Sequence, residues 1–215
     1  AKWLCTICPD QEQSTMLHAK DDLAFRWACQ NGHLELAKWL WAICPDQEQS
    51  GMLHAKDNWA FRFACEKGHF KLAKWLMGLC KTPKEQLTML HADDDVAFSR
   101  ACEYGDQKTA KWLWGLCQTP KEQLTMLHAH DDYAFRWACA HGHLEIAEWL
   151  WGLCQTSEEK IEMLHADYDV AFRVACQKGY PKVAEWLWKV CVDLEQPEML
   201  HAIDNYAFRW ACENG

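Results

Sequence analysis

The sequence predicts an all-α fold, a solenoid of helix–turn–helix units of 36–37 residues, and two observations carry this prediction. The first is a pair of cysteine columns with that spacing. One column comprises Cys8, Cys44, Cys80, Cys117, Cys154 and Cys191, and the other comprises Cys29, Cys65, Cys102, Cys139, Cys176 and Cys212. The second is that the Met-Leu-His-Ala segment at 16–19, the Ala-Phe pair at 24–25 and the Trp-Leu pair at 39–40 also recur once per period. Repetition at this period is typical of arrays in which each unit packs on its neighbours.

We therefore expect a single repeat array over residues 1–215. It comprises a partial repeat at 1–21, five complete repeats at 22–57, 58–94, 95–131, 132–168 and 169–204, and a partial repeat at 205–215. The chain starts inside a predicted helix and stops before the next one, and neither end carries a polar capping repeat. We expect a piece cut from a longer array, with head-to-tail stacking of the exposed ends as the alternative.

Each complete repeat is expected to contain a helix A, a helix B and a loop. An Asp or Asn before the Ala-Phe pair, such as Asp132, is expected to cap helix A and to pair with the Arg four residues later. A glycine such as Gly142 should end helix A in the left-handed conformation, and helix B follows at once. Asp106 and Pro181 suit the start of helix B. A polar stretch and an extended Met-Leu-His-Ala finger should complete the repeat.

The composition excludes several classes of protein. Half of the residues are apolar and a quarter are charged, which excludes wholesale disorder. The net charge of −9, from 22 Lys+Arg against 31 Asp+Glu, argues against nucleic acid as a partner, because phosphate binding needs a basic face. No apolar run reaches the ~20 residues of a membrane span. The 13 cysteines, too many and too spread for a small disulfide-stapled domain, favour a reduced protein of the cytoplasm.

Catalytic and metal chemistry is weakly indicated. Repeats stacked ~8–10 Å apart keep the sulfurs of one column too distant for a disulfide or a zinc site, although pairing across columns stays open. The histidine of the Met-Leu-His-Ala segment occurs six times, whereas a catalytic site is normally single. We expect no enzyme activity, no cofactor and no metal. The helix B tryptophans at 39, 75, 112, 149 and 186 should pack between repeats, and Trp41, Trp114, Trp151 and Trp188 are candidates for an outer apolar strip available to a partner.

The run at 133–150, Tyr-Ala-Phe-Arg-Trp-Ala-Cys-Ala-His-Gly-His-Leu-Glu-Ile-Ala-Glu-Trp-Leu, closely resembles an ankyrin repeat, and the resemblance covers the whole chain. Two departures are evident. Helix A starts with Ala-Phe-Arg in place of the usual Thr-Pro-Leu-His. Each unit is also three or four residues longer than the 33-residue norm, so we expect an extra helical turn or a bulged loop after helix B. HEAT-like or tetratricopeptide helix pairs are the alternative fold.

The resemblance implies a protein-interaction scaffold whose partner binds a concave groove lined by the finger tips and the end of helix A. The residues at these positions vary from repeat to repeat, which suits one specific partner, although unconstrained solvated positions would vary too. Many are acidic, so we expect a basic protein partner. A self-assembling structural protein is the alternative function. The candidate binding residues are Asp21, Gln30, Asn31, Asp57, Glu66, Lys67, Asp94, Arg100, Glu103, Tyr104, His130, Asp131, His141, Tyr168 and Lys178.

Overall fold

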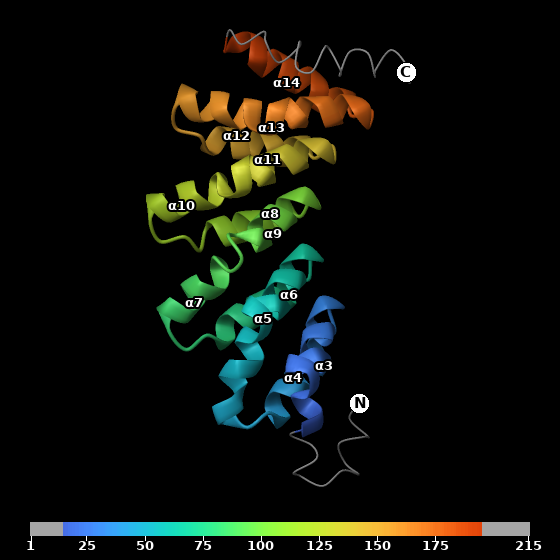
Figure 1. The fold of residues 1–215 in the computed structure, drawn as a ribbon, viewed down its shortest axis with the longest axis vertical. Coiled ribbons are helices and arrows are strands. Elements are labelled where there is room, and N and C mark those ends of the chain that lie inside the picture. Colours follow the sequence, from blue (N-terminus) through green and yellow to red (C-terminus); the bar gives the residue numbers. More distant parts are fainter. Residues whose placement is uncertain (1–14, 195–215) are drawn as a thin grey trace. The chain divides into compact units, whose positions relative to one another are not determined.

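The computed structural model describes residues 15–194, and all regular structure in this range is helical, which confirms the all-α prediction. The chain divides into two compact units, residues 1–97 and 98–215, each treated by itself below. None of the described helices combines the length and apolar character needed to cross a membrane. The helices, in chain order and as labelled in Figure 1, are α3 (Ala19–Gln30), α4 (Leu34–Ile43), α5 (Asp46–Glu66), α6 (Phe70–Leu79), α7 (Pro83–Leu90), α8 (Val96–Glu103), α9 (Gln107–Trp114), α10 (Pro120–Leu127), α11 (Ala129–Ala140), α12 (Leu144–Leu153), α13 (Ser157–Gln177) and α14 (Pro181–Asp193).

The predicted helix A and helix B alternate along the chain. Helix A corresponds to α8 and to the C-terminal parts of α3, α5, α11 and α13, while helix B corresponds to α4, α6, α9, α12 and α14. Successive A helices pack on each other, α3 on α5 in the first unit and α11 on α13 in the second (Figure 1). Asp106 caps α9 by accepting from the Thr109 backbone N–H at 3.1 Å, and α14 begins at Pro181, as expected.

The glycine after each described helix A is left-handed, as predicted, and at Gly32, Gly105 and Gly142 it also allows a close contact with the next repeat. Gly142 has a φ of 78°, and a Cβ placed there would lie 2.7 Å from the Tyr180 ring. The His69 ring lies equally close to Gly32, and the His143 ring lies as close to Gly105. Glycine is therefore needed twice over, for its backbone conformation and for the space that a neighbouring ring occupies.

The Met-Leu-His segment is helical, so the predicted extended finger is wrong. It ends a short third helix in each described repeat, which is α7, α10 or the first part of α5 or α13. Thr119 shows why this helix forms: its side chain accepts from the Glu122 backbone N–H at 3.2 Å, Glu122 completes a capping box, and Pro120 occupies the first turn. The buried Met126 and Leu127 then anchor the helix on the core. The extra length predicted after helix B is thus an added helix.

The core of each unit is built on one phenylalanine per repeat and the tryptophans around it. Phe135 is 0% exposed, and its ring centroid lies 6.0 Å from that of Trp151 and 6.2 Å from that of Trp186 in the next repeat. Phe25, Trp41 and Trp75 form the same triad in the first unit, as do Phe98, Trp114 and Trp149 in the second.

These triads place the helix B tryptophans between repeats, as predicted for Trp75, Trp149 and Trp186. The outer apolar strip is wrong for Trp41, Trp114 and Trp151, because each is half-buried against a phenylalanine of helix A. Of the four tryptophans assigned to that strip, Trp188 is the exposed one, at 43%.

Candidate functional site

Three consecutive residues in the left-handed conformation precede helix A in every described repeat. Their φ values lie between 50° and 63°, and none of them is glycine. Left-handed backbone costs roughly 1–2 kcal/mol per L-residue, least for Asp and Asn, so such a run needs support from its surroundings. The five left-handed turns are 20–22, 56–58, 93–95, 130–132 and 167–169.

A histidine bond supports the third residue of each left-handed turn, which is a carboxylate in four turns and the amide of Asn58 in the fifth. Asp132 is 5% exposed, and its Oδ1 accepts from His128 Nδ1 at 2.6 Å. Because an ionised carboxylate only accepts, Nδ1 carries the proton. The predicted N-cap role of this Asp is replaced by the bond to histidine. The same bond, at 2.5–2.6 Å, joins His18 to Asp22, His54 to Asn58, His91 to Asp95 and His165 to Asp169.

In four of the five left-handed turns, an arginine of helix A supports the other two residues; Ser99 stands at the arginine position that follows the turn at 93–95. Arg136 donates from Nε to the Asp131 carbonyl at 2.6 Å and from Nη2 to the His130 carbonyl at 2.8 Å. The predicted pairing of this arginine with the Asp four residues earlier is therefore wrong, because the guanidinium binds backbone carbonyls. The same two bonds are made by Arg26, Arg62 and Arg173.

The histidine bond gives a testable contribution to stability. Replacing Asp132 by Ala should lower the free energy of unfolding by about 2 kcal/mol, because it leaves the part-buried His128 unpaired and puts Ala in a left-handed position. Asp132→Asn should cost under about 1 kcal/mol, since Asn58 fills the same role in its own repeat. Urea unfolding followed by circular dichroism measures both. Equal losses for the two variants would contradict the assigned role.

The same pair should make stability depend on pH. The hydrogen bond to Asp132 raises the pKa of His128 above its usual 6.5, against an opposing effect of burial. A raised histidine pKa adds stability that is complete below the unfolded-state pKa and is lost as pH rises through the folded-state pKa. The stability difference between the native protein and Asp132→Asn should therefore shrink as pH rises from below the usual histidine pKa of 6.5 through the raised folded-state pKa of His128. A difference that grows over this range in urea unfolding would show that the charged pair is not stabilising.

The structure places the predicted turn residues at the surface. Asp21, Asp57, Asp94, His130, Asp131 and Tyr168 are all exposed, and Tyr168 reaches 77%. Several neighbouring charges are paired. Lys56 Nζ lies 2.8 Å from Asp21 Oδ2, and this contact lowers the pKa of Asp21. Arg62 pairs with Asp93, and Arg136 pairs with Asp167. Within residues 15–194, no ion pair involves Asp57, Asp94 or Asp131, so these three leave uncompensated negative charge on their units.

The predicted residues at the end of helix A divide into exposed and enclosed ones. Asn31, Lys67, Tyr104 and Lys178 are exposed, while Gln30, Glu66, Arg100 and His141 are half-buried. The Gln30 carbonyl accepts from His69 Nε2 of the next repeat at 3.0 Å. Glu103 is 7% exposed, so the prediction that it lies on the binding surface is wrong.

Glu103 is enclosed because it joins a three-residue network in the second unit. Arg100 Nη1 donates to Glu103 Oε2 at 2.5 Å and to the Tyr133 hydroxyl at 2.7 Å, and that hydroxyl donates to Glu103 at 3.0 Å. Burial and Glu103 raise the pKa of Tyr133 to about 12, so the phenol keeps its proton. Ser99 and Arg100 stand where other repeats carry Arg and an apolar residue. The bonds to Glu103 and Tyr133 make Arg100 part of the packed structure of the second unit. Ser99 itself is buried, and its hydroxyl has no hydrogen-bond partner.

Aromatic side chains on helix A add to the surface formed by the candidate binding residues, and they were not among the residues predicted from the sequence. In the first unit, Trp27 is 56% exposed, and the rings of Trp59 and Phe63 stack at 4.1 Å. In the second unit, Trp137 lies 5.6 Å from the rings of both Tyr133 and His141, and Lys178 Nζ lies 5.9 Å from the Trp137 ring. The four-residue spacing 133, 137, 141 along one helix was a usable signal for a shared face.

The described cysteines are free thiols, most of them buried. Burial raises the pKa of Cys29 to about 12 and raises those of Cys102 and Cys139 further, so these thiols stay protonated at neutral pH. The predicted framework role of the two columns agrees with this burial.

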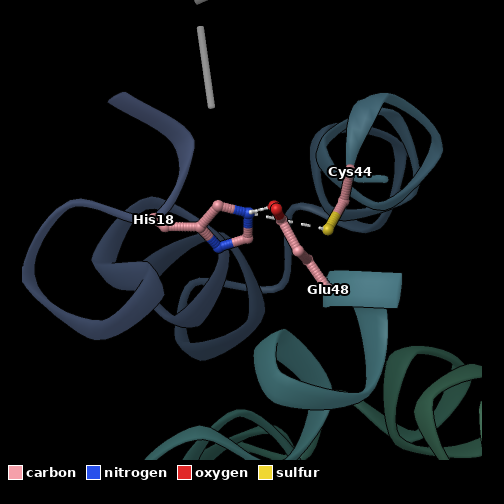
Figure 2. Close-up of side chains that lie close together, drawn as sticks. All are labelled: His18, Cys44 and Glu48. Atoms are coloured by element: carbon pink, nitrogen blue, oxygen red, sulfur yellow. Dashed lines mark hydrogen bonds and ion pairs between the residues drawn. The ribbon is translucent and has the colours of Figure 1, made fainter. Parts of the chain in front are cut away.

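One group of three potential metal ligands lies in the first unit, and the sequence analysis did not find it. His18, Cys44 and Glu48 place Nε2, Sγ and a carboxylate oxygen within 4.8 Å of one another (Figure 2). Cys44 is buried, and burial, followed by the nearby Glu48 charge, raises the pKa of its thiol to about 11. No other such group occurs among residues 15–194.

The predicted head-to-tail contacts would involve the chain ends at 1–14 and 195–215, which lie outside the described residues. No protein-family model matches the chain, and the comparison with curated proteins finds no match either.

Proposed function

We propose that the chain is an ankyrin-type repeat array that acts as a protein-interaction scaffold. Support comes from the alternation of helix A and helix B, the left-handed glycine between them, and the ring that the next repeat packs on that glycine. The chain departs from the ankyrin pattern in having a helix and a left-handed turn where the extended finger was expected. The proposed role requires no catalytic group.

One observation carries the proposal: each described left-handed turn exposes its first two side chains, and its costly backbone is held by a histidine bond and, in four of the five turns, by arginine bonds. The arginine and histidine bonds fix the backbone of the turn, as at 130–132. The exposed pairs differ between repeats, from Lys20-Asp21 to Asp167-Tyr168, while the buried third residue stays Asp or Asn. A fixed backbone with variable exposed side chains loses little conformational entropy on binding, which suits specific recognition.

The partner we propose is a basic protein surface. In the first unit Asp57 and Asp94, and in the second Asp131, supply the uncompensated negative charge described above. Exposed aromatic rings such as Trp27 lie on the adjoining helix A and offer contact area of the kind that anchors protein interfaces. Because the described thiols are free, we further propose a reducing, cytoplasmic location.

The test is affinity capture from a native lysate with two matched variants. The site variant carries Asp57→Asn, Asp94→Asn and Asp131→Asn, substitutions that the left-handed backbone tolerates. The control carries Glu35→Gln, Glu148→Gln and Glu185→Gln, which remove the same charge from exposed helix B positions. We expect a protein that binds the native chain and the control but binds the site variant at least ~10-fold more weakly. Retention by all three chains alike would contradict the proposed surface.

A further inference from the structure

The three side chains of the cluster shown in Figure 2 converge from different segments of the first unit. His18 precedes α3, Cys44 follows the last residue of α4, and Glu48 lies in the first turn of α5. His18 Nε2 lies 2.7 Å from Glu48 Oε2 and 3.9 Å from Cys44 Sγ. Imidazole, thiol and carboxylate are the three side-chain groups that zinc sites combine.

Two of the three distances between these atoms can be compared with a tetrahedral zinc site, and the third, between Cys44 Sγ and the Glu48 oxygen, is within 4.8 Å. With Zn–N, Zn–S and Zn–O bonds of about 2.0–2.3 Å, ligand atoms lie about 3.6 Å apart for N and S and about 3.4 Å apart for N and O. The observed N···S distance of 3.9 Å needs almost no change. The N···O distance must widen by about 0.7 Å, which a rotation of Glu48, whose side chain is 40% exposed, can supply.

The surroundings already orient the histidine as a ligand. Its other ring nitrogen, Nδ1, donates to Asp22 Oδ1 at 2.5 Å, and Asp22 is 7% exposed. A carboxylate bound to the far nitrogen of a ligating histidine is the usual second partner in zinc sites, where it fixes the ring and strengthens the ligand. Zinc would take the place of the protons on Nε2 and Sγ, which pass to solvent.

Three other repeats share the histidine and cysteine but use their glutamate differently. Glu85, five residues after Cys80, turns back so that Oε2 accepts from the Lys81 backbone N–H at 2.6 Å. Glu122 and Glu159 do the same in their repeats. Glu48 comes only four residues after Cys44, and Pro45 stands at the N-cap where the other three repeats have a threonine, so no threonine cap forms there. This one-residue difference leaves the Glu48 carboxylate beside His18.

We propose that His18, Cys44 and Glu48 bind one zinc ion, with water or a partner's side chain as the fourth ligand. The ion joins the start of α3 to the α4–α5 connection and so stabilises the first unit. This site does not include Asp57, Asp94 or Asp131, although His18 also binds Asp22 of the left-handed turn at 20–22.

Zinc binding to the chelator-treated full chain tests the proposal, with calorimetry for affinity and Co²⁺ absorption as a probe of thiolate ligation. The native chain should bind Zn²⁺ and raise its unfolding temperature, and Co²⁺ should give a thiolate charge-transfer band. Glu48→Gln should weaken Zn²⁺ binding at least ~10-fold, while Glu85→Gln, the matched change in the next repeat, should leave it unchanged.

Cys44→Ser should remove the charge-transfer band, whereas Cys80→Ser should keep it. Circular dichroism verifies that each variant is folded, and Glu48→Gln, on a half-exposed side chain, keeps the test valid if Cys44→Ser unfolds. Absence of Zn²⁺ binding by the native chain, or equal losses in Glu48→Gln and Glu85→Gln, would overturn the site.

Discussion

Phe135→Ala should lower the free energy of unfolding by about 3–5 kcal/mol, the largest effect expected from a single substitution in this chain. Phe135 is 0% exposed and contacts Trp151 of its own repeat and Trp186 of the next. Its loss removes the transfer free energy of the ring and leaves a cavity at the junction of two repeats. Urea unfolding followed by far-UV circular dichroism measures the change.

The control for this prediction is Trp188→Ala, which truncates a residue of α14 that is 43% exposed. It should cost clearly less than Phe135→Ala, because nearly half of the side chain is already in water and its loss leaves no enclosed cavity. A loss for Phe135→Ala no greater than that for Trp188→Ala would mean that the aromatic triads do not hold adjacent repeats together.

Gly142→Ala should cost about 2–4 kcal/mol, the second largest effect. Alanine at a φ of 78° is strained, and its Cβ would lie 2.7 Å from Tyr180 Cδ1 and 2.9 Å from Cε1. Both atoms belong to a ring that packs between repeats, so relief requires the neighbouring repeat to move. Thermal unfolding measures the loss.

Gly152→Ala is the matched control, because Gly152 lies inside α12 and a Cβ there meets no atom within 4 Å. Alanine should stabilise the chain by about 0.5–1 kcal/mol at this helical position. The two Gly→Ala changes, ten residues apart in the sequence, are therefore expected to have opposite signs. Destabilisation of similar size at both positions would contradict the close-approach explanation.

Periodicity was sufficient to predict helix A, helix B and the glycine between them, because these depend on local spacing and on the backbone freedom of glycine. The third helix was also predictable. Thr119, Pro120 and Glu122 form a capping signature that local rules recognise, but the Met-Leu-His segment was interpreted as a finger by analogy with shorter repeats.

The left-handed turns could not be predicted from local sequence. Lys56 and Asp57 have no intrinsic preference for three left-handed residues in a row, and no glycine marks the turn. The conformation depends on bonds from outside the turn, from Arg62 to its carbonyls and from His54 to Asn58. The cluster of His18, Cys44 and Glu48 could not be predicted for a related reason. Cys44 lies 26 residues from His18, and the spacing within one column does not show which residues of another column lie nearby.

The dependence on salt of binding to the purified partner tests the central claim most directly. If the exposed Asp57, Asp94 and Asp131 attract a basic surface, the affinity of the native chain should fall steeply between about 50 and 300 mM salt. The variant with Asn at all three positions should bind more weakly at low salt and should lose much less affinity over this range. Equal affinity and equal salt dependence for the two chains would contradict the account.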